Sequence, residues 1–578
     1  MKILVINLTT GEQKERDLAD PLMAGRYLSS TLVNEYVHPL AEPLSPDNAL
    51  VFATGVLANM RTSTASRLSV GCKSPLTKGI KESNAGGMAG DSIAALGYRA
   101  VVFLGTLPEG QHAVYKLDQD GGQLDNESAA ACWGLGTEDT VAFLLKTFGK
   151  DNCVISIGQA GERLMGTAGI AVTDAEGNPF RLAARGGVGA VMGSKGLKAI
   201  IVPLPPRSGT ELSKEARQPI TDFNKHVATS ERVGVLRNFG TASTVMPVQE
   251  MGGLPVRNFS KGQLPDATSI GGDFMREIIL KRGGEGKATH ACMTGCVIQC
   301  SNAFADENGE LLAAPVEFET IGLCGSNLEI ASLDGIARIN RLCNDFGMDT
   351  IETGATLGVM MEAAEMEQLP DGIMREDLPR FGDVESALKA LRQVPEDTQI
   401  GNLVGAGVAA TGKTLGIKRI PAVKGQAMSA YDPRVVKGTA VTYATSPQGA
   451  DHTAGLTVFF PIDHRDPSLA VKFSRIAQIQ RAAYDAIDLC AFNTSATGQR
   501  PDIVVQMLRK VYQVDLPDNY LDILGRKVID LEIAFNRAAG LTAEDDRIPD
   551  FFKNEALTEP VHTVFDVSDA ELDSIWNS

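Results

Sequence analysis

Three cysteines lie within nine residues of one another in the segment Cys292-Met-Thr-Gly-Cys296-Val-Ile-Gln-Cys300. The whole chain of 578 residues has only nine cysteines, so thiols are concentrated here. Soft thiolate ligands at short spacing are what an iron-sulfur cluster or a zinc ion requires. The segment is therefore the first candidate for a metal centre.

The spacing of these cysteines bears on the kind of centre. On a straight helix Cys292 and Cys300 would lie about 12 Å apart along the axis, too far to share one cluster, so the segment must bend, and Gly295 can provide the bend. A zinc site usually has a second close pair of Cys or His residues downstream, and none follows within thirty residues. The pattern favours an iron-sulfur cluster, with a zinc site or buried thiols as the alternatives.

A cubane cluster needs a fourth ligand from elsewhere in the chain. The isolated Cys490, in the segment DAIDLC, is the best candidate. The other cysteines lie among apolar or small residues, as core thiols do; they are Cys72, Cys132, Cys153, Cys324 and Cys343.

Two carboxylates and one histidine are candidates for acid-base chemistry. Glu317 and Glu319 follow the cysteines closely, and burial can make such a carboxylate basic. His452 is the most suggestive of the seven histidines, because it lies in a small polar loop bounded by glycines. The alternatives are a solvated strand edge for the two glutamates and a structural role for the histidine.

Two glycine-rich runs could bring backbone close to an anionic ligand. In Ala184-Arg185-Gly186-Gly187-Val188-Gly189, Arg185 would supply charge to a phosphorylated group. This run matches a dinucleotide-binding loop poorly, because the third glycine is displaced by one residue. The second run, Asn84-Ala85-Gly86-Gly87, has Arg67 and Lys73 upstream as anion partners. Plain structural turns are the alternative for both runs.

The string Gly407-Val-Ala-Ala-Thr-Gly412-Lys413-Thr414 matches the phosphate-binding P-loop letter by letter. The motif works only between a buried strand and a helix, and the residues before Gly407 are interrupted by glycines. Leu403, Val404, Val408 and Leu415 instead suit one helix across the whole segment. A P-loop NTPase is thus the alternative from a different functional class.

The elements that must position these residues change character near residue 205. Pro203, Pro205 and Pro206 mark a boundary there, and beyond it Asp349 with Glu352 resembles a capping box that opens a helix. Helices are expected after the boundary, for example over 333-347, 468-487 and 527-540. Short strands are expected before it, at 2-8, 50-55, 100-106, 112-118, 153-158, 168-174 and 198-204.

Charge and hydropathy exclude some functions. A formal net charge of −17 argues against a nucleic-acid partner, for which a basic face would be expected. No apolar run reaches the eighteen residues that a membrane span needs. The N-terminus reads as a strand and not as a signal peptide, and the odd number of thiols favours a reducing cytoplasm as the location.

Taken together, these stretches resemble the tungsten-dependent aldehyde:ferredoxin oxidoreductase family. The resemblance covers nearly the whole chain, and its most specific features are the block ARGGVGAVMGSKGLKAI and the presence of all the motifs in one sequence. Other matching stretches are ILVINLTTGE, KSPLTKGIKESNAGG, PVEFETIGLCGSNL, FGMDTIETG, AYDPR and VIDLEIAFNRAAGLTAEDDRIPDFF.

The resemblance implies an α+β fold in three domains. Residues 1-205 would form an N-terminal β-sheet domain, the base of a bis-pterin site, and two mainly α-helical domains would follow at 206-415 and 416-578. Between them it implies a tungsten (or molybdenum) bis-pyranopterin, held by its own dithiolenes and not by a side chain. A [4Fe-4S] cluster beside it would be bound by Cys292, Cys296, Cys300 and Cys490.

The resemblance also assigns roles to residues at matching positions. Glu319, or alternatively Glu317, would be the general base, and His452 would orient the substrate or act as an acid. Asp349 and Asp485 would begin the two loops that hold the pterins, although Asp349 could be only a helix cap. Carbonyls of Asn84 and Ala184 would bind a bridging Mg²⁺. The pterin phosphates would be contacted by Arg67, Asn84, Ala184, Arg185, Gly186 and Gly187.

The implied reaction oxidises an aldehyde to a carboxylic acid with water, and electrons leave through the cluster to ferredoxin or an iron-sulfur electron-transfer subunit, in a homo- or hetero-oligomer. Acid or ring reduction with the same cofactors, and a noncatalytic iron-sulfur subunit, are the alternatives. The chain departs from the family pattern twice. Its cysteines are spaced Cys-x3-Cys-x3-Cys instead of Cys-x2-Cys-x3-Cys, and Asp488 stands where the family has glycine.

Overall fold

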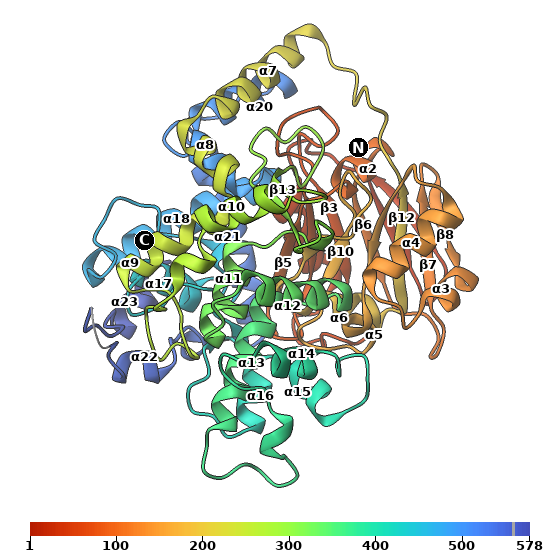
Figure 1. The fold of residues 1–578 in the computed structure, drawn as a ribbon. Coiled ribbons are helices and arrows are strands. Elements are labelled where there is room, and N and C mark those ends of the chain that lie inside the picture. Colours follow the sequence, from red (N-terminus) through yellow and green to blue (C-terminus); the bar gives the residue numbers. More distant parts are fainter. Residues whose placement is uncertain (558–560, 578) are drawn as a thin grey trace.

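Two six-stranded sheets form the N-terminal part of the molecule, shown in red and orange in Figure 1. The computed structural model describes residues 1–557 and 561–577. The first sheet, in the order β2-β1-β6-β3-β4-β5, consists of β1 (Lys2–Asn7), β2 (Gln13–Asp17), β3 (Leu50–Thr54), β4 (Leu68–Lys73), β5 (Ile80–Ala85) and β6 (Tyr98–Leu104). The second, in the order β11-β10-β9-β12-β7-β8, consists of β7 (Ala113–Asp118), β8 (Gly121–Asp125), β9 (Asn152–Ser156), β10 (Ile170–Val172), β11 (Arg181–Ala183) and β12 (Leu197–Pro203).

The sheets are mixed, and their inner faces share one apolar core. β1 pairs with β6 and β7 with β12 in parallel, whereas the β3–β4 and β4–β5 pairs are antiparallel. Phe52 of β3 belongs to the same buried cluster as Ile155 of β9, to which α2 (Ala89–Ala95) and α6 (Val188–Ser194) also contribute. Because neighbouring strand residues point to opposite faces, Val51 instead packs beneath α1 (Gly25–Tyr36).

The chain after β12 is mainly helical and covers one side of the sheets (Figure 1). A small sheet of β13 (Lys287–His290), β14 (Ser301–Ala305) and β15 (Leu311–Ala313) brackets the cysteine segment. The principal helices are α7 (Lys214–Ala228), α8 (Glu231–Phe239), α9 (Val245–Met251), α10 (Gly272–Arg282), α11 (Phe318–Cys324), α12 (Leu333–Phe346), α13 (Thr350–Ala364), α14 (Val384–Leu391), α15 (Gln399–Ala406), α16 (Val408–Thr414), α17 (Lys437–Thr445), α18 (Pro467–Ile487), α20 (Asp502–Tyr512), α21 (Tyr520–Ala538), α22 (Asp550–Asn554) and α23 (Asp569–Ser574).

The predicted α+β class is confirmed, and the expected strands, as well as the helices expected over 333-347, 468-487 and 527-540, overlap elements of the structure. The three domain limits remain predictions. In the part of the chain that the structure describes, we find no helix that combines the length and the apolar character needed to cross a bilayer.

The P-loop hypothesis is wrong, because the motif does not follow a strand. Its first residue, Gly407, separates two helices, α15 and α16, and has φ +90°. The single helix predicted across the segment is also wrong. A Cβ at Gly407 would lie 3.0 Å from Glu352 Oε1, so this left-handed glycine allows the buried carboxylate to approach the backbone.

The predicted capping box is wrong in its second half. Asp349 is the N-cap of α13 and accepts a hydrogen bond from the amide of Ile351 at 2.9 Å. Glu352 does not reach back to the cap. Its fully buried carboxylate accepts from the amides of Val408 at 2.9 Å and Ala427 at 2.8 Å, and so joins three distant segments.

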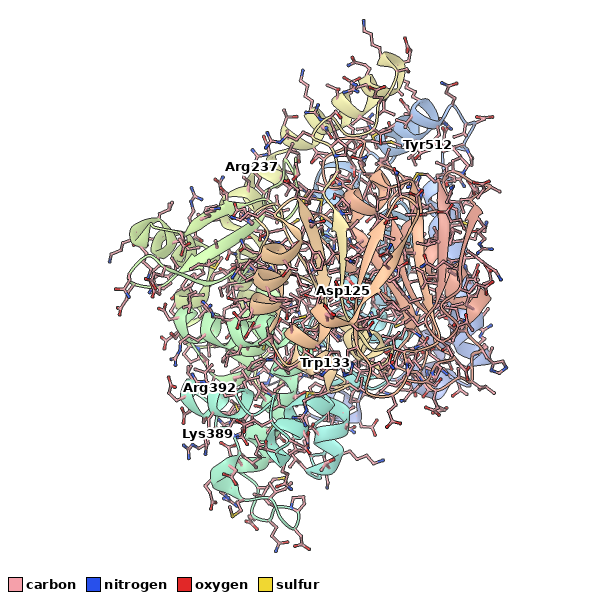
Figure 2. The ribbon with its side chains drawn as sticks, turned by 90° about the vertical axis from the view of Figure 1, so that its right-hand side faces the viewer. Asp125, Trp133, Arg237, Lys389, Arg392 and Tyr512 are labelled. Carbon is pink, nitrogen blue, oxygen red and sulfur yellow. The ribbon has the colours of Figure 1, made fainter. Side chains whose placement is uncertain are left out.

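The helices are attached to the sheets by polar contacts between residues far apart in the sequence. The Tyr512 hydroxyl of α20 donates to the carbonyl of Val56, just after β3, and Arg237 of α8 donates to the carbonyl of Val297 in the cysteine segment at 2.6 Å; Tyr512 and Arg237 both lie in the upper part of the view in Figure 2. Deeper inside, Arg26 of α1 donates two hydrogen bonds to Glu532 of α21, at 2.9 and 2.7 Å.

The Arg26–Glu532 pair gives a stability prediction. Glu532 is fully buried, so Glu532→Ala leaves the Arg26 cation without its partner, and we expect the free energy of unfolding to fall by about 3–5 kcal/mol in urea titrations. The control is Asp502→Asn, which removes the exposed Arg500–Asp502 pair and should change stability little. Equal losses in the two variants would contradict a structural role for the buried pair.

Candidate active site

The glycine turn and the edge strand of the first sheet meet at the centre of the molecule. Ala184 to Gly187 form a tight turn between β11 and α6, and not between two strands. The carbonyl of Gly186 accepts a hydrogen bond from Ser74 at 2.7 Å. Gly186 has φ +81°, and a Cβ there would lie 2.7 Å from Lys81 Cγ. Only glycine therefore allows this close approach of the turn to β5.

A buried network of charges surrounds this junction. Lys81 donates to Asp451 at 2.7 Å, and Arg185 lies 3.9 Å from the same carboxylate and 3.5 Å from Asp349. Although burial acts in the other direction, the cations of Lys81 and Arg185 hold the pKa of Asp451 well below its usual range. Arg185 also donates to the carbonyls of Ala427 at 2.5 Å and Ala450 at 2.8 Å.

Arg67 and Asn84 lie at the same sheet edge. The Arg67 guanidinium donates to the side-chain oxygen of Asn84 and, at 3.2 Å, to its carbonyl. The Asn84 amide donates to Asp488 at 2.6 Å. Asp488 is the C-cap of α18 and has φ +60°, a left-handed conformation that favours glycine. The aspartate side chain has room there because its Cβ packs against two glycines, Gly25 and Gly55. Asp485 lies inside the last turn of α18, 3.5 Å from Arg26.

Polar atoms without hydrogen-bond partners gather around this network, within the described residues. They include Arg185 Nε and Nη1, Asp349 Oδ2, Glu319 Oε1, Tyr443 OH, both amide atoms of Gln426, Gln448 Nε2, Arg481 Nε and Nη1, and Asp488 Oδ2. Buried polar groups are normally satisfied, and each exception costs about 1–3 kcal/mol. These donors and acceptors therefore fit a large, polar, anionic cofactor such as a phosphorylated pterin.

Glu319 and His452 face each other beside the network. Glu319 Oε1 lies 3.6 Å from His452 Nε2, while Glu319 Oε2 accepts from the amide of Ala430 at 2.8 Å. Burial raises the pKa of Glu319, although His452 and Arg185 act against it. A carboxyl group with a raised pKa beside an imidazole is suited to proton transfer near neutral pH.

Glu317 points elsewhere. Its carboxylate accepts a hydrogen bond from Thr241. Burial is the main cause of the raised pKa of the Cys300 thiol, and the negative charge of Glu317 raises that pKa further. The structure thus separates the two glutamates, of which the family resemblance favoured Glu319 as the base. Glu319 faces His452, whereas Glu317 faces the cysteine segment.

The four predicted cluster cysteines act on one another electrostatically, and two of them, Cys292 and Cys490, also act on Arg67. Cys292 and Cys490 both raise the pKa of Arg67 against the effect of burial. A hydrogen bond from Cys296 lowers the pKa of Cys292 to about 6, which favours the thiolate. Cys300 responds electrostatically to Cys292 and Cys490. No group of three His, Cys, Asp or Glu side chains in the described ranges has the geometry to hold one metal ion.

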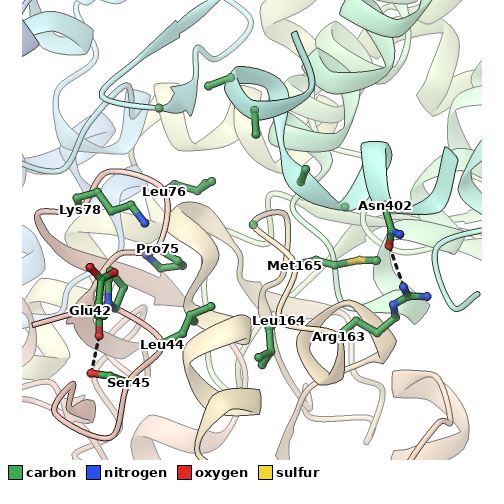
Figure 3. A pocket seen from close by; sticks show the side chains of 17 residues that line it. Glu42, Leu44, Ser45, Pro75, Leu76, Lys78, Arg163, Leu164, Met165 and Asn402 are labelled. Atoms are coloured by element: carbon green, nitrogen blue, oxygen red, sulfur yellow. Dashed lines mark hydrogen bonds between the residues drawn. The ribbon is translucent and has the colours of Figure 1, made fainter. Parts of the chain in front are cut away.

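A separate pocket of about 700 Å³ lies on the surface beside residues 407-414, the segment that matches the P-loop sequence (Figure 3). Its walls include Leu76 and Lys78 on one side and Arg163 on the other, where Arg163 donates to Asn402 at 2.8 Å. It contains neither Glu319 nor His452 nor the cluster cysteines. We therefore do not assign the chemistry to this pocket.

Comparison with known proteins agrees with these observations. The family described as "Aldehyde ferredoxin oxidoreductase, N-terminal domain" matches residues 3–203, and "Aldehyde ferredoxin oxidoreductase, domains 2 & 3" matches residues 218–574. The tungsten-containing aldehyde ferredoxin oxidoreductases of Pyrococcus furiosus and Thermococcus kodakarensis are 32% and 31% identical to the chain, each over 96% of it and 92% of the relative. The aliphatic sulfonate oxidoreductase, WOR-like subunit, of P. furiosus is 26% identical over 92% of the chain and 85% of the relative.

The fold is similar to that of the active site complex BamBC of benzoyl coenzyme A reductase in complex with 1,5-dienoyl-CoA. The TM-score is 0.75 at 18% identity, and the alignment covers 95% of this chain and 90% of the other. Together, the fold, the buried polar site and the matches define an oxidoreductase. The chain belongs to the aldehyde ferredoxin oxidoreductase family, which confirms the resemblance predicted from its motifs.

Several residues of the site were not predicted from the sequence. Lys81, Ser429, Asp451 and Glu352 all contact predicted site residues or the segments that carry them. Asp451 was signalled only by its position next to His452. Lys81 was signalled by a charge within a strand whose neighbours are buried. The remaining two gave no local signal, because their role depends on segments distant in the chain.

Glu352 gives a prediction about pH. Burial raises its pKa to about 7 in the folded protein, whereas an unperturbed glutamate titrates near 4.5. The folded state therefore binds the proton more tightly, and its stability should decrease as the pH rises from about 4.5 to 7. In Glu352→Gln, urea unfolding of the cofactor-free protein should show a smaller slope over this range. The exposed Glu367→Gln is the control, and an unchanged slope in Glu352→Gln would contradict the assignment.

Proposed function

We propose that this protein is a tungsten (or molybdenum) bis-pterin oxidoreductase that oxidises an aldehyde to a carboxylic acid with water. The observation that carries the proposal is the Glu319–His452 pair, which lies 3.6 Å apart beside a buried group of unpartnered polar atoms. The tungsten-containing relatives, whose names specify aldehyde oxidation, cover nearly the whole chain and support it.

The side chains around the glycine turn would hold the cofactor. Arg185 is a buried cation with two unpartnered nitrogens for phosphate oxygens, Arg67 adds a second cation at the same sheet edge, and the turn from Ala184 to Gly187 brings backbone close without side-chain bulk. Carbonyls of Asn84 and Ala184 would bind the bridging Mg²⁺, and Asp349 and Asp485 would contact the pterins. When bound, the metal-pterin group supplies the two-electron redox chemistry.

The chain itself would move the protons and position the substrate. Glu319 is buried and has a raised pKa, so in its ionised form it can take a proton from water or a hydrated aldehyde. The Ala430 amide fixes one carboxylate oxygen and leaves the other facing His452. A proton on His452 Nε2 can stabilise negative charge on the substrate oxygen. Both side chains keep a small exposed surface through which water or a substrate can reach them.

Electrons would leave through a [4Fe-4S] cluster bound by Cys292, Cys296, Cys300 and Cys490. Gly295 has φ +75°, which provides the bend that the spacing required. The amide of Gly87 donates to the Cys292 carbonyl at 3.0 Å, and the amide of Cys490 donates to the Thr64 carbonyl at 3.0 Å, so both cysteine loops are anchored to the N-terminal domain. An oxidised ferredoxin, or an iron-sulfur electron-transfer subunit, would accept the electrons.

Replacing the proposed base tests the reaction. Glu319→Gln should lower kcat by about 10²–10⁴-fold with tungsten and iron contents unchanged, because only proton transfer is removed. In the wild type, kcat/KM should fall as the pH is lowered through the raised pKa of Glu319. Steady-state assays of aldehyde oxidation and metal analysis measure both. Activity in Glu319→Gln but not in Glu317→Gln would transfer the role to Glu317.

Replacing the fourth proposed cluster ligand tests the electron path. The anoxically purified wild type should contain about four irons per chain, and Cys490→Ser should lower this content and change the visible absorption. Cys132→Ser, which removes a buried core thiol in the apolar cluster of the second sheet, is the control. An unchanged spectrum in Cys490→Ser would remove Cys490 from the ligand set.

A further inference from the structure

The hydroxyl of Ser429 holds the side of the His452 ring that faces away from Glu319. Ser429 Oγ lies 2.9 Å from His452 Nδ1, and Ser429 is fully buried. Neither the sequence motifs nor the family comparisons assign a role to this serine. The contact matters because a neutral imidazole carries its proton on only one nitrogen, and the partner of the other nitrogen decides which.

The two possible tautomers fit their surroundings differently. With the proton on Nδ1, Ser429 would accept it, and the bare Nε2 would face Glu319 Oε1 at 3.6 Å, acceptor against acceptor. With the proton on Nε2, the Ser429 hydroxyl donates to Nδ1, and the N–H points toward Glu319 Oε1. That oxygen has no hydrogen-bond partner among the residues that the structure describes. The second tautomer thus gives the Ser429 proton an acceptor and sets a donor, not a second acceptor, opposite Glu319 Oε1.

One neighbouring charge acts in the opposite direction. Asp451 Oδ1 lies 3.7 Å from His452 Nδ1 and would attract a proton there. This oxygen already accepts from the Thr453 amide at 2.9 Å and the Thr453 hydroxyl at 2.7 Å. Ser429 is the closer partner of Nδ1. The Tyr443 hydroxyl also faces Ser429, and because burial raises the pKa of Tyr443 well above its usual range, this phenol keeps its proton and can donate it to Ser429 Oγ, which leaves the Ser429 proton for Nδ1. The nearer hydrogen bond therefore determines the tautomer.

We propose that Ser429 is a positioning residue that selects the Nε2–H tautomer of His452. The selected N–H is then directed into the space between His452 and Glu319, where a substrate oxygen would receive it. The proposal rests on the proposed function for the role of His452 in turnover. The hydrogen bond itself does not depend on that function.

Chemical labelling of the holoenzyme tests the tautomer without turnover. Diethylpyrocarbonate attacks an unprotonated imidazole nitrogen, and in the wild type the unprotonated Nδ1 is covered by Ser429. Labelling of His452, followed by peptide mass spectrometry, should be slow in the wild type and about tenfold faster in Ser429→Ala, the factor expected for one lost hydrogen bond. Ser429→Thr keeps the hydroxyl and should label slowly. The exposed His38 and His562 are internal references.

Steady-state kinetics supply the second measurement. In Ser429→Ala, kcat should fall about tenfold with KM nearly unchanged, and Ser429→Thr should restore it. Ser326→Ala is the matched control, because it removes a buried hydroxyl that donates only to the Gly322 carbonyl at 3.1 Å. If Ser429→Ala labels His452 at the wild-type rate, the proposal is overturned. If labelling changes as expected but the loaded wild type does not oxidise aldehydes, the Ser429 assignment stands and the proposed function fails.

Discussion

The site depends on charges that are buried together and compensate one another. Lys81, Arg185 and Asp451 come from three separate segments, and none of them would be stable alone in the interior. Paired, they fix β5, the glycine turn and the loop before His452 in one arrangement. Moving any one of these segments would leave a buried charge without its partner, which is costly. The ion pairs therefore hold the three segments together.

Around these pairs, a second set of buried polar atoms has no partner within the protein. A fold tolerates such atoms only where something else satisfies them. Their position between the sheets and the helices, beside Arg185 and Glu319, connects stability with function: the interior is completed by the cofactor that the family membership implies. Glu352 is a buried polar group whose hydrogen bonds are made within the protein. Its carboxylate joins α13 to the segments that carry Val408 and Ala427.

Departures from the family pattern also have a physical reading. Asp488 occupies a left-handed C-cap that normally requires glycine, and its side chain fits because two glycines, Gly25 and Gly55, leave room for it. It then binds the amide of Asn84. The longer first gap between the cysteines is accommodated by Gly295, whose positive φ reverses the chain between Cys292 and Cys296.

The sequence by itself determined the family, the α+β class and the residues of the glycine turn, because these depend on local motifs and on periodicity. It placed the general features of the site on Arg185, Asn84, Glu319 and His452. Its local pattern could not distinguish Glu319 from Glu317, and only the family resemblance favoured Glu319, because the direction of each side chain is set by tertiary contacts. The tertiary structure decided that difference, and it alone revealed Lys81, Ser429 and Glu352, whose partners lie tens to hundreds of residues away. The P-loop string failed for the same reason: its letters match, but a helix and not a strand precedes it.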